Sequence, residues 1–248
     1  MQAAILNDLT KCIGCEACVL ACKEGNGLDK SPRNALSAQT LTVIENRNGL
    51  NVRRHCMHCL NPACVSACPV EALQVTECGA VVYDASKCMG CRYCMIACPF
   101  GIPTYEWDSV KPRVKKCTMC YFTALQEGTA PACTSVCPTG ATLFGEREEL
   151  IKIAHERLRD HPERYAQTIY GLGQAGGTSV LYLSPIPFEE LGIAGPVLER
   201  AYPELTWRVL SKIPNVVSVL GVTLFGVWWI IQRRMKLENE SDTGKAEA

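Results

Sequence analysis

The sequence predicts an α+β domain built from a duplicated, cysteine-rich unit, followed by one helix that crosses a membrane. Three observations predict this fold class. Sixteen of the 17 cysteines fall in four short runs between residues 12 and 137. The runs match in pairs by their spacing, which indicates an internal repeat. A stretch of uncharged, mostly apolar residues at 213–231 has the length of a membrane-spanning helix.

The spacing of the cysteines indicates iron–sulfur clusters. The first and third runs have the C-x2-C-x2-C-x3-C spacing of bacterial ferredoxins, and three of the four runs end in Cys-Pro. The second and fourth runs share a wider gap after their second cysteine. Three cysteines on a short loop can hold three corners of a cuboidal cluster, and the fourth cysteine of a run then ligates the other cluster. The runs are Cys12, Cys15, Cys18 and Cys22; Cys56, Cys59, Cys64 and Cys68; Cys88, Cys91, Cys94 and Cys98; and Cys117, Cys120, Cys133 and Cys137.

Other uses of cysteine explain this pattern less well. Zinc ribbons also use C-x2-C pairs, but they rarely add a tight third and fourth cysteine or a Cys-Pro ending. Disulfides suit small secreted scaffolds with an even count, whereas this chain has an odd count and several cysteines too close to pair. Inert buried thiols would not repeat four times. Cys78 lies outside the runs, and we expect it to be a bystander.

The rest of the sequence contains no recognisable catalytic motif, which fits a protein that transfers electrons and does not itself convert a substrate. The formal net charge is zero, so a nucleic-acid partner is not expected. The chain has no phosphate-binding glycine loop, nucleophile elbow or supported acid–base pair. No secretory or twin-arginine signal is visible at the N-terminus. We therefore expect that the cysteine-rich part either stays in the cytoplasm or is exported folded, with a partner that carries the signal.

The segments between the runs predict small hairpins and one surface helix. Apolar residues at 41–44 and 50–52 flank an Asn-Gly turn at Asn48 and Gly49, and a second hairpin is expected at 72–83, turning at Cys78 and Gly79. From 146 to 165 the apolar residues recur with helical spacing. They are Leu150, Ile151, Ala154 and Leu158. Duplicated two-cluster ferredoxin modules with small hairpins and short helices would have this pattern.

The C-terminal part predicts a partner-binding arm and a membrane anchor. Residues 166–205 are rich in Gly and Pro with one apolar segment at 180–183, which suits an extended arm packed on a partner. About 19 uncharged residues at 213–231 form a helix of roughly 28 Å, close to the thickness of a bilayer core. That stretch contains no histidine, so it cannot hold a haem through histidine. The expected divisions are a four-cluster domain at 1–145, a helix and arm at 146–205, a transmembrane anchor at 206–235 and a polar, disordered tail at 236–248.

The distribution of basic residues predicts the orientation of this anchor. Three basic residues follow the apolar stretch and two precede it, so the positive-inside rule places the tail in the cytoplasm and the cysteine-rich part outside. The basic residues are Arg233, Arg234 and Lys236 after the stretch, and Arg208 and Lys212 before it.

The motifs around the cysteines resemble a known family. Cys56-Met57-His58-Cys59, the segment 90–99 and the segment 133–141 look like the four-cluster ferredoxin subunits of membrane-bound bacterial respiratory oxidoreductases, over nearly the whole chain. The segments 145–150 and 187–192 are similar to electron-transfer subunits of periplasm-facing uptake hydrogenases and of respiratory formate dehydrogenase.

The resemblance implies four [4Fe–4S] clusters with a crossed ligation. The first cluster would take Cys12, Cys15, Cys18 and Cys137; the second Cys117, Cys120, Cys133 and Cys22; the third Cys56, Cys59, Cys64 and Cys98; and the fourth Cys88, Cys91, Cys94 and Cys68. The chain would relay single electrons between a catalytic subunit of hydrogenase or formate dehydrogenase type and a membrane subunit that binds quinone or haem. The alternatives are a subunit of another respiratory molybdoenzyme complex, a zinc-stabilised structural protein and an autonomous cluster enzyme.

Several polar residues flank the runs and are open to two interpretations. A histidine or cation beside a cluster could raise its reduction potential, and the same residue could equally serve packing or lie exposed in solvent. The histidines are His55 and His58, and the cations are Arg53, Arg54, Arg92, Lys115 and Lys116.

Overall fold

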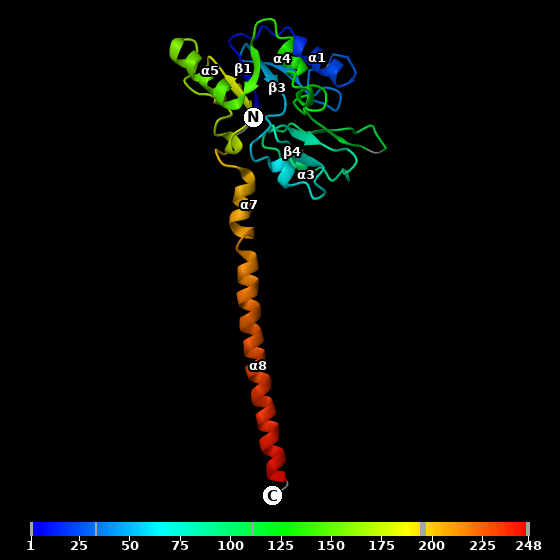
Figure 1. Ribbon diagram of the computed structural model, residues 1–248, viewed down its shortest axis with the longest axis vertical. Helices are drawn as coiled ribbons and strands as arrows, with labels where there is room; N and C mark the ends of the chain where they lie inside the picture. The colour runs from blue at the N-terminus through cyan, green and yellow to red at the C-terminus, as the bar shows by residue number, and fades with distance from the viewer. Residues whose placement is uncertain (1, 33, 111, 194–196, 247–248) are drawn as a thin grey trace. The chain divides into compact units, whose positions relative to one another are not determined.

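The computed structural model describes residues 2–32, 34–110, 112–193 and 197–246, with side chains up to Leu237. The chain divides into two compact units, residues 1–203 and residues 204–248 (Figure 1). The first unit holds every cysteine and all strands of the described chain, whereas the second is helical.

A three-stranded sheet organises the first unit. Its order is β8 (Thr142–Glu146), β1 (Ala3–Asp8) and β9 (Val180–Leu183). Strand β8 pairs antiparallel with β1, and β9 pairs parallel with it. All six residues of β1 are buried, as expected for a strand with neighbours on both sides. Because the end of β1 pairs with the start of β8, the first cysteine run leaves the sheet where the fourth run enters it.

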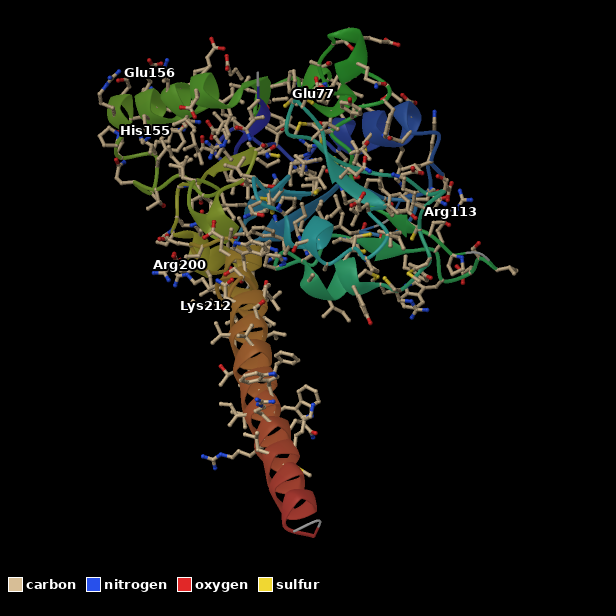
Figure 2. The ribbon with its side chains drawn as sticks, turned by 60° about the horizontal axis from the view of Figure 1, so that its bottom comes forward. Glu77, Arg113, His155, Glu156, Arg200 and Lys212 are labelled. Atoms are coloured by element: carbon tan, nitrogen blue, oxygen red, sulfur yellow. The ribbon has the colours of Figure 1, made fainter. Side chains whose placement is uncertain are left out.

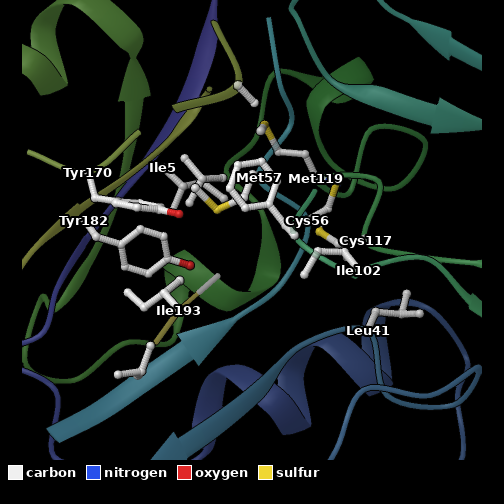
Figure 3. Packing of buried hydrophobic residues seen from close by; sticks show 14 of the residues in the cluster. Ile5, Leu41, Cys56, Met57, Ile102, Cys117, Met119, Tyr170, Tyr182 and Ile193 are labelled. Atoms are coloured by element: carbon white, nitrogen blue, oxygen red, sulfur yellow. Dashed lines mark hydrogen bonds between the residues drawn. The ribbon is translucent and has the colours of Figure 1, made fainter. Parts of the chain in front are cut away.

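The position of β9 corrects the prediction of an arm packed on a partner. All four residues of β9 are buried within this chain, and the Tyr182 hydroxyl donates a hydrogen bond to the Arg53 carbonyl oxygen at 2.7 Å. Tyr170 packs edge-on against Tyr182, next to Ile5 of β1 (Figure 3). The apolar segment 180–183 therefore completes the chain's own core, because β1 offers it a free edge.

Three hairpins surround the cysteine runs. Strands β2 (Val43–Arg47) and β3 (Leu50–Arg54) form the predicted Asn-Gly hairpin, in which Asn48 and Gly49 both have positive φ. Strands β4 (Leu73–Val75) and β5 (Val81–Tyr83) form the second predicted hairpin. A third, β6 (Thr104–Tyr105) with β7 (Val114–Lys115), was not expected, because strands of two residues leave no periodic pattern.

Four short helices each contain one or two cysteines of one run. They are α1 (Ala17–Gly25), α2 (Ala63–Ser66), α3 (Tyr93–Ala97) and α4 (Ala132–Ser135). Helix α1 packs against α4, and α2 packs against α3. The fold therefore brings the first run to the fourth and the second run to the third. Two 3-10 turns, Leu125–Glu127 and Gln174–Gly176, and helix α6 (Phe188–Leu191) complete the connections.

Helix α5 (Arg147–Asp160) covers one face of the sheet, as the periodicity of its apolar residues predicts. It buries Leu150, Ala154 and Leu158 against β1 and β8. His155 and Glu156 on its other face are exposed (Figure 2). The helix ends five residues before the predicted position 165, since Pro162 disfavours helical geometry in the preceding residue.

The second unit contains the apolar helix that the sequence predicts. Helix α7 (Tyr202–Leu210) precedes α8 (Ile213–Ala246), and Pro214 lies in the first turn of α8, where proline is tolerated. Within the described residues, one helical segment, Tyr202–Leu237, is long and apolar enough to cross a membrane. Helix α8 extends to Ala246, into the segment from residue 236 for which the sequence predicts a polar, disordered tail.

Candidate iron–sulfur site

The first cysteine group joins the two ends of the cysteine-rich region. Cys12, Cys15 and Cys18 line one pocket together with Cys137, which the β1–β8 pairing brings beside them. Gly14 has a φ of +73°, and a Cβ there would lie 2.9 Å from the Asn51 side-chain oxygen. The Asn51 amide donates to the Cys12 carbonyl oxygen at 3.0 Å. The loop therefore needs glycine at this position, since strand β3 braces it from outside.

The second group lies at the contact between α1 and α4. The Cys22 thiol is close enough to interact electrostatically with Cys133 and Cys120, and Cys117 interacts with both Cys22 and Cys133. All four cysteines are buried. The packing of α1 on α4 thus surrounds a set of sulfurs from two distant runs.

The third group combines the second run with the end of the third run. The Cys59 thiol interacts with Cys56, Cys98 and Cys64, and Cys64 interacts with Cys56 and Cys98. Helix α2 carries Cys64, and Cys98 directly follows α3, which packs against α2. The contact between these two short helices is what brings Cys98 to the second run.

The fourth group mirrors the first. Cys88, Cys91 and Cys94 line a second pocket together with Cys68. Gly90 occupies the position of Gly14, with a φ of +78°, and a Cβ there would lie 2.7 Å from the Tyr105 hydroxyl oxygen. The Tyr105 hydroxyl donates to the Gly90 carbonyl oxygen at 3.3 Å. The same loop conformation is therefore braced by an unrelated residue.

The thiol donors of these four groups are the ligands that iron–sulfur clusters take. In the part of the chain that the structure describes, no three Cys, His, Asp or Glu side chains converge closely enough to hold one metal ion. A zinc ion would require four sulfurs at about 2.3 Å from one point. An iron–sulfur cluster is held by four thiolates that converge from different directions onto a larger inorganic core. The donor sets therefore fit the clusters that the spacing predicts.

Burial governs the acidity of the metal-free thiols. Burial raises the pKa of Cys18 to about 11 and the pKa of Cys22 and of Cys64 to about 12. Cys137 differs, because hydrogen bonds from the backbone of Thr142 and Thr139 outweigh the opposing effect of burial and lower its pKa. The buried thiols are therefore protonated near neutral pH, and ligation by iron must displace their protons.

Both histidines beside the second run are buried, and their pKa values are lowered. Burial, followed by the cations Arg53 near His55 and Lys116 near His58, holds both histidine pKa values well below the usual range. His58 Nδ1 accepts a hydrogen bond from the Val81 backbone N–H at 2.9 Å. Among the described residues, His58 Nε2 and His55 Nδ1 have no partner.

The leftover cysteine lies apart from these groups. Cys78 sits in the β4–β5 turn, 3.2 Å from the Thr76 hydroxyl, and lines neither cysteine pocket. Sequence reasoning missed the residues that brace the loops, Asn51 and Tyr105. Neither has a local signal, because each acts on a loop that is distant in the sequence.

Comparisons with known proteins agree with the type of cofactor that the cysteine spacing indicates. Two family models, each described as a 4Fe-4S dicluster domain, match residues 49–147 and 11–72. A protein from Nitratidesulfovibrio vulgaris is 39% identical over 95% of this chain and 68% of its own length. The hydrogenase-2 operon protein HybA of Escherichia coli O157:H7 is 34% identical over 76% of this chain and 72% of its own length. The formate dehydrogenase-O iron-sulfur subunit of Escherichia coli K12 is 36% identical over 73% and 66%, respectively.

These matches confirm the predicted family, and they agree with the cofactor class that the cysteine spacing indicates. The likeness to the first two relatives extends over most of this chain and more than two thirds of theirs. The chain belongs to the family of 4Fe–4S dicluster iron–sulfur subunits that includes these hydrogenase-operon and formate dehydrogenase proteins.

Proposed function

We propose that the chain relays single electrons through four [4Fe–4S] clusters held by the sixteen cysteines of the four runs. The observation that carries this proposal is the lining of the two cysteine pockets. Each contains three cysteines of one run and the last cysteine of another run, Cys137 in one and Cys68 in the other. That is the crossed arrangement of two-cluster ferredoxins. When bound, each cluster takes up and releases one electron at a time.

The proposed ligand groups are named here in order along the chain of contacts. Group A is Cys12, Cys15, Cys18 and Cys137; group B is Cys22, Cys117, Cys120 and Cys133; group C is Cys56, Cys59, Cys64 and Cys98; and group D is Cys68, Cys88, Cys91 and Cys94.

Thiols of neighbouring groups support this order. Cys18 of group A interacts with Cys133 of group B. Cys117 of group B interacts with Cys56 of group C, and Cys64 of group C interacts with Cys94 of group D. The exposed ligands are Cys15 and Cys91, which belong to groups A and D. The proposed row therefore has its two accessible ends at A and D, where electrons would enter and leave.

Matching backbone conformations support the proposed duplication of a two-cluster module. The residue before α1 and the residue before α3, Glu16 and Arg92, both have positive φ, at 56° and 65°. In the second and fourth runs, His58 and Met119 precede the second cysteine with φ values of 46° and 58°. Positive φ is uncommon for residues other than glycine, so its recurrence at equivalent positions favours a repeated unit.

Clusters should be countable in the purified protein. Anaerobically purified full-length chain is expected to contain about 16 iron atoms and to show a broad visible absorbance that bleaches on reduction. A colourless preparation containing zinc would support the structural alternative. Four or fewer irons per chain would rule out the four-cluster relay.

The partners are proposed from the relatives and from the apolar helix. We infer that one end of the row contacts a catalytic subunit of hydrogenase or formate dehydrogenase type, and that the other end contacts a membrane subunit that binds quinone or haem. The alternative is that this chain is the electron-transfer subunit of another respiratory molybdoenzyme complex. Helix α8 would anchor the chain in a single pass, with a cytoplasmic tail and the ferredoxin-like part on the outer side.

Removing the apolar helix is expected to release the chain from the membrane. A chain that ends at residue 203 lacks the candidate span and should appear in the soluble fraction after a carbonate wash, whereas the full chain stays in the membrane pellet. A chain that ends at Leu237 keeps the apolar helix and is the matched control, which should remain in the pellet. Recovery of the full chain in the soluble fraction would contradict the anchor.

A further inference from the structure

Arg53 is a buried cation without a carboxylate partner. Its side chain is on β3, and the residue is 3% exposed. The guanidinium donates from Nε to the Thr42 hydroxyl at 3.1 Å. Among the described residues, Nη1 has no hydrogen-bond partner and no carboxylate lies within ion-pair distance. Burying an unpaired charge is costly, so the site implies a negative group that the protein itself does not supply.

The surroundings of Arg53 identify where that negative charge belongs. The guanidinium interacts with thiols of two ligand groups and lines the pocket of group A beside Cys137. The interacting thiols are Cys12 and Cys18 of group A and Cys22, Cys117, Cys120 and Cys133 of group B. Arg53 therefore lies at the junction between A and B. A [4Fe–4S] core with four thiolates carries net negative charge, which would provide the missing counter-charge there.

Lys116 occupies the next junction in the same way. It is 4% exposed, and its Nζ donates to the carbonyl oxygens of Val81 and of Cys117, at 2.5 Å and 2.9 Å. The same Nζ lies 3.8 Å from the Cys56 sulfur of group C. Cys117 belongs to group B, so the ammonium lies between B and C. No carboxylate in the described part of the chain is within ion-pair distance of it.

The third junction, between groups C and D, is lined mainly by apolar side chains. Cys64 of group C and Cys94 of group D share a core cluster whose other buried members are Leu73, Val81, Tyr105 and Val114. Lys116 touches this cluster from the side of group C, because its Nζ donates to the Val81 carbonyl oxygen, whereas Arg92, which lines the pocket of group D, is exposed. Two of the buried cations, Arg53 and Lys116, thus lie beside thiols at the A–B and B–C junctions.

We propose that Arg53 and Lys116 set the reduction potentials of the clusters on either side of them, Arg53 for groups A and B and Lys116 for groups B and C. This inference rests on the proposed four-cluster relay. Reduction adds negative charge, and a fixed cation in a poorly solvated site stabilises the reduced form more than the oxidised form. Each cation therefore raises the potentials of its two neighbours, and the free Nη1–H of Arg53 can donate to a cluster sulfur.

The test is a redox titration of the anaerobically purified full-length chain, followed by electron paramagnetic resonance. Arg53→Met should shift the potentials of two of the four clusters downward, and Lys116→Met should shift two clusters downward, one of them in common. Arg53→Lys keeps the charge and should restore most of the wild-type potentials. Arg54→Met is the matched control on the same strand, because Arg54 already pairs with Glu45 at 3.1 Å, and it should shift none.

Each outcome decides the inference. Three outcomes would overturn it. The potentials could stay unchanged in Arg53→Met with all four clusters present, or all four could shift equally. Arg53→Lys could also shift the potentials as much as Arg53→Met does. If Arg53→Met loses clusters that Arg53→Lys retains, iron content alone supports the need for charge, whereas equal losses in both variants would reduce Arg53 to a packing residue. Wild-type protein with fewer than four clusters would overturn the relay itself, a failure distinct from unshifted variants of an intact wild type.

Discussion

Replacing Cys137 with serine is expected to remove the cluster bound by Cys12, Cys15 and Cys18, although more than a hundred residues separate Cys137 from them. The four side chains line one pocket, because β1 and β8 pair antiparallel and bring the first and fourth runs together. A [4Fe–4S] cluster needs four thiolates, so the variant should lose about four of about 16 irons. Iron analysis together with electron paramagnetic resonance measures the loss.

Two further variants make the assignment specific. Cys15→Ser should abolish the same resonance signal as Cys137→Ser, whereas Cys120→Ser should abolish a different one. Cys78→Ser is the matched control and should retain all the iron, because Cys78 lines neither pocket. If the spectrum of Cys137→Ser instead matched that of Cys120→Ser, Cys137 would belong with its own run and the crossed ligation would be wrong.

Replacing Arg157 with methionine is expected to destabilise the first unit by about 3 kcal/mol. Arg157 of α5 donates to the Asp8 carboxylate at 2.8 Å, and the Asp8 side chain is completely buried at the end of β1. Tyr165 and Thr10 also donate to Asp8, but they carry no charge. The variant therefore leaves a buried carboxylate without a counter-ion, four residues before Cys12.

The apparent melting temperature of the variant, compared with wild type at a fixed scan rate, should fall by about 6–12 °C. Arg159→Met is the matched control on the same helix. Arg159 pairs with Asp160 at 3.0 Å, but both side chains are largely exposed, so the change should be near zero. Equal melting temperatures for the two variants would show that the ion pair at Asp8 contributes nothing to stability.

The parts of the fold that follow from short-range sequence were predicted correctly. The Asn48–Gly49 turn forms because glycine and asparagine tolerate positive φ, and the apolar residues on both sides of it pair as strands. Helix α5 forms because apolar residues recur at helical spacing. The cysteine spacing indicated the cofactor class because a short ligand loop around a cluster is itself a local structure.

Other features depended on contacts between distant segments. Residues 180–183 would be apolar whether they packed on a partner or completed the chain's own sheet beside β1, so the sequence alone does not distinguish the two. Asn51 and Tyr105 contact the first and third runs from other elements, so the sequences of those runs do not predict these contacts.

The two arginines at the end of β3 separate what the sequence can predict from what only the fold decides. The sequence by itself determined the four cysteine runs, their matching spacing and the family, because these depend on residue spacing along the chain. It offered Arg53 and Arg54 as equal neighbours of the cysteines. Only the tertiary structure decided that Arg53 faces inward between two thiol groups while Arg54 pairs with Glu45. Successive side chains of a strand point to opposite faces of the sheet, and which face is buried depends on the elements that pack against it.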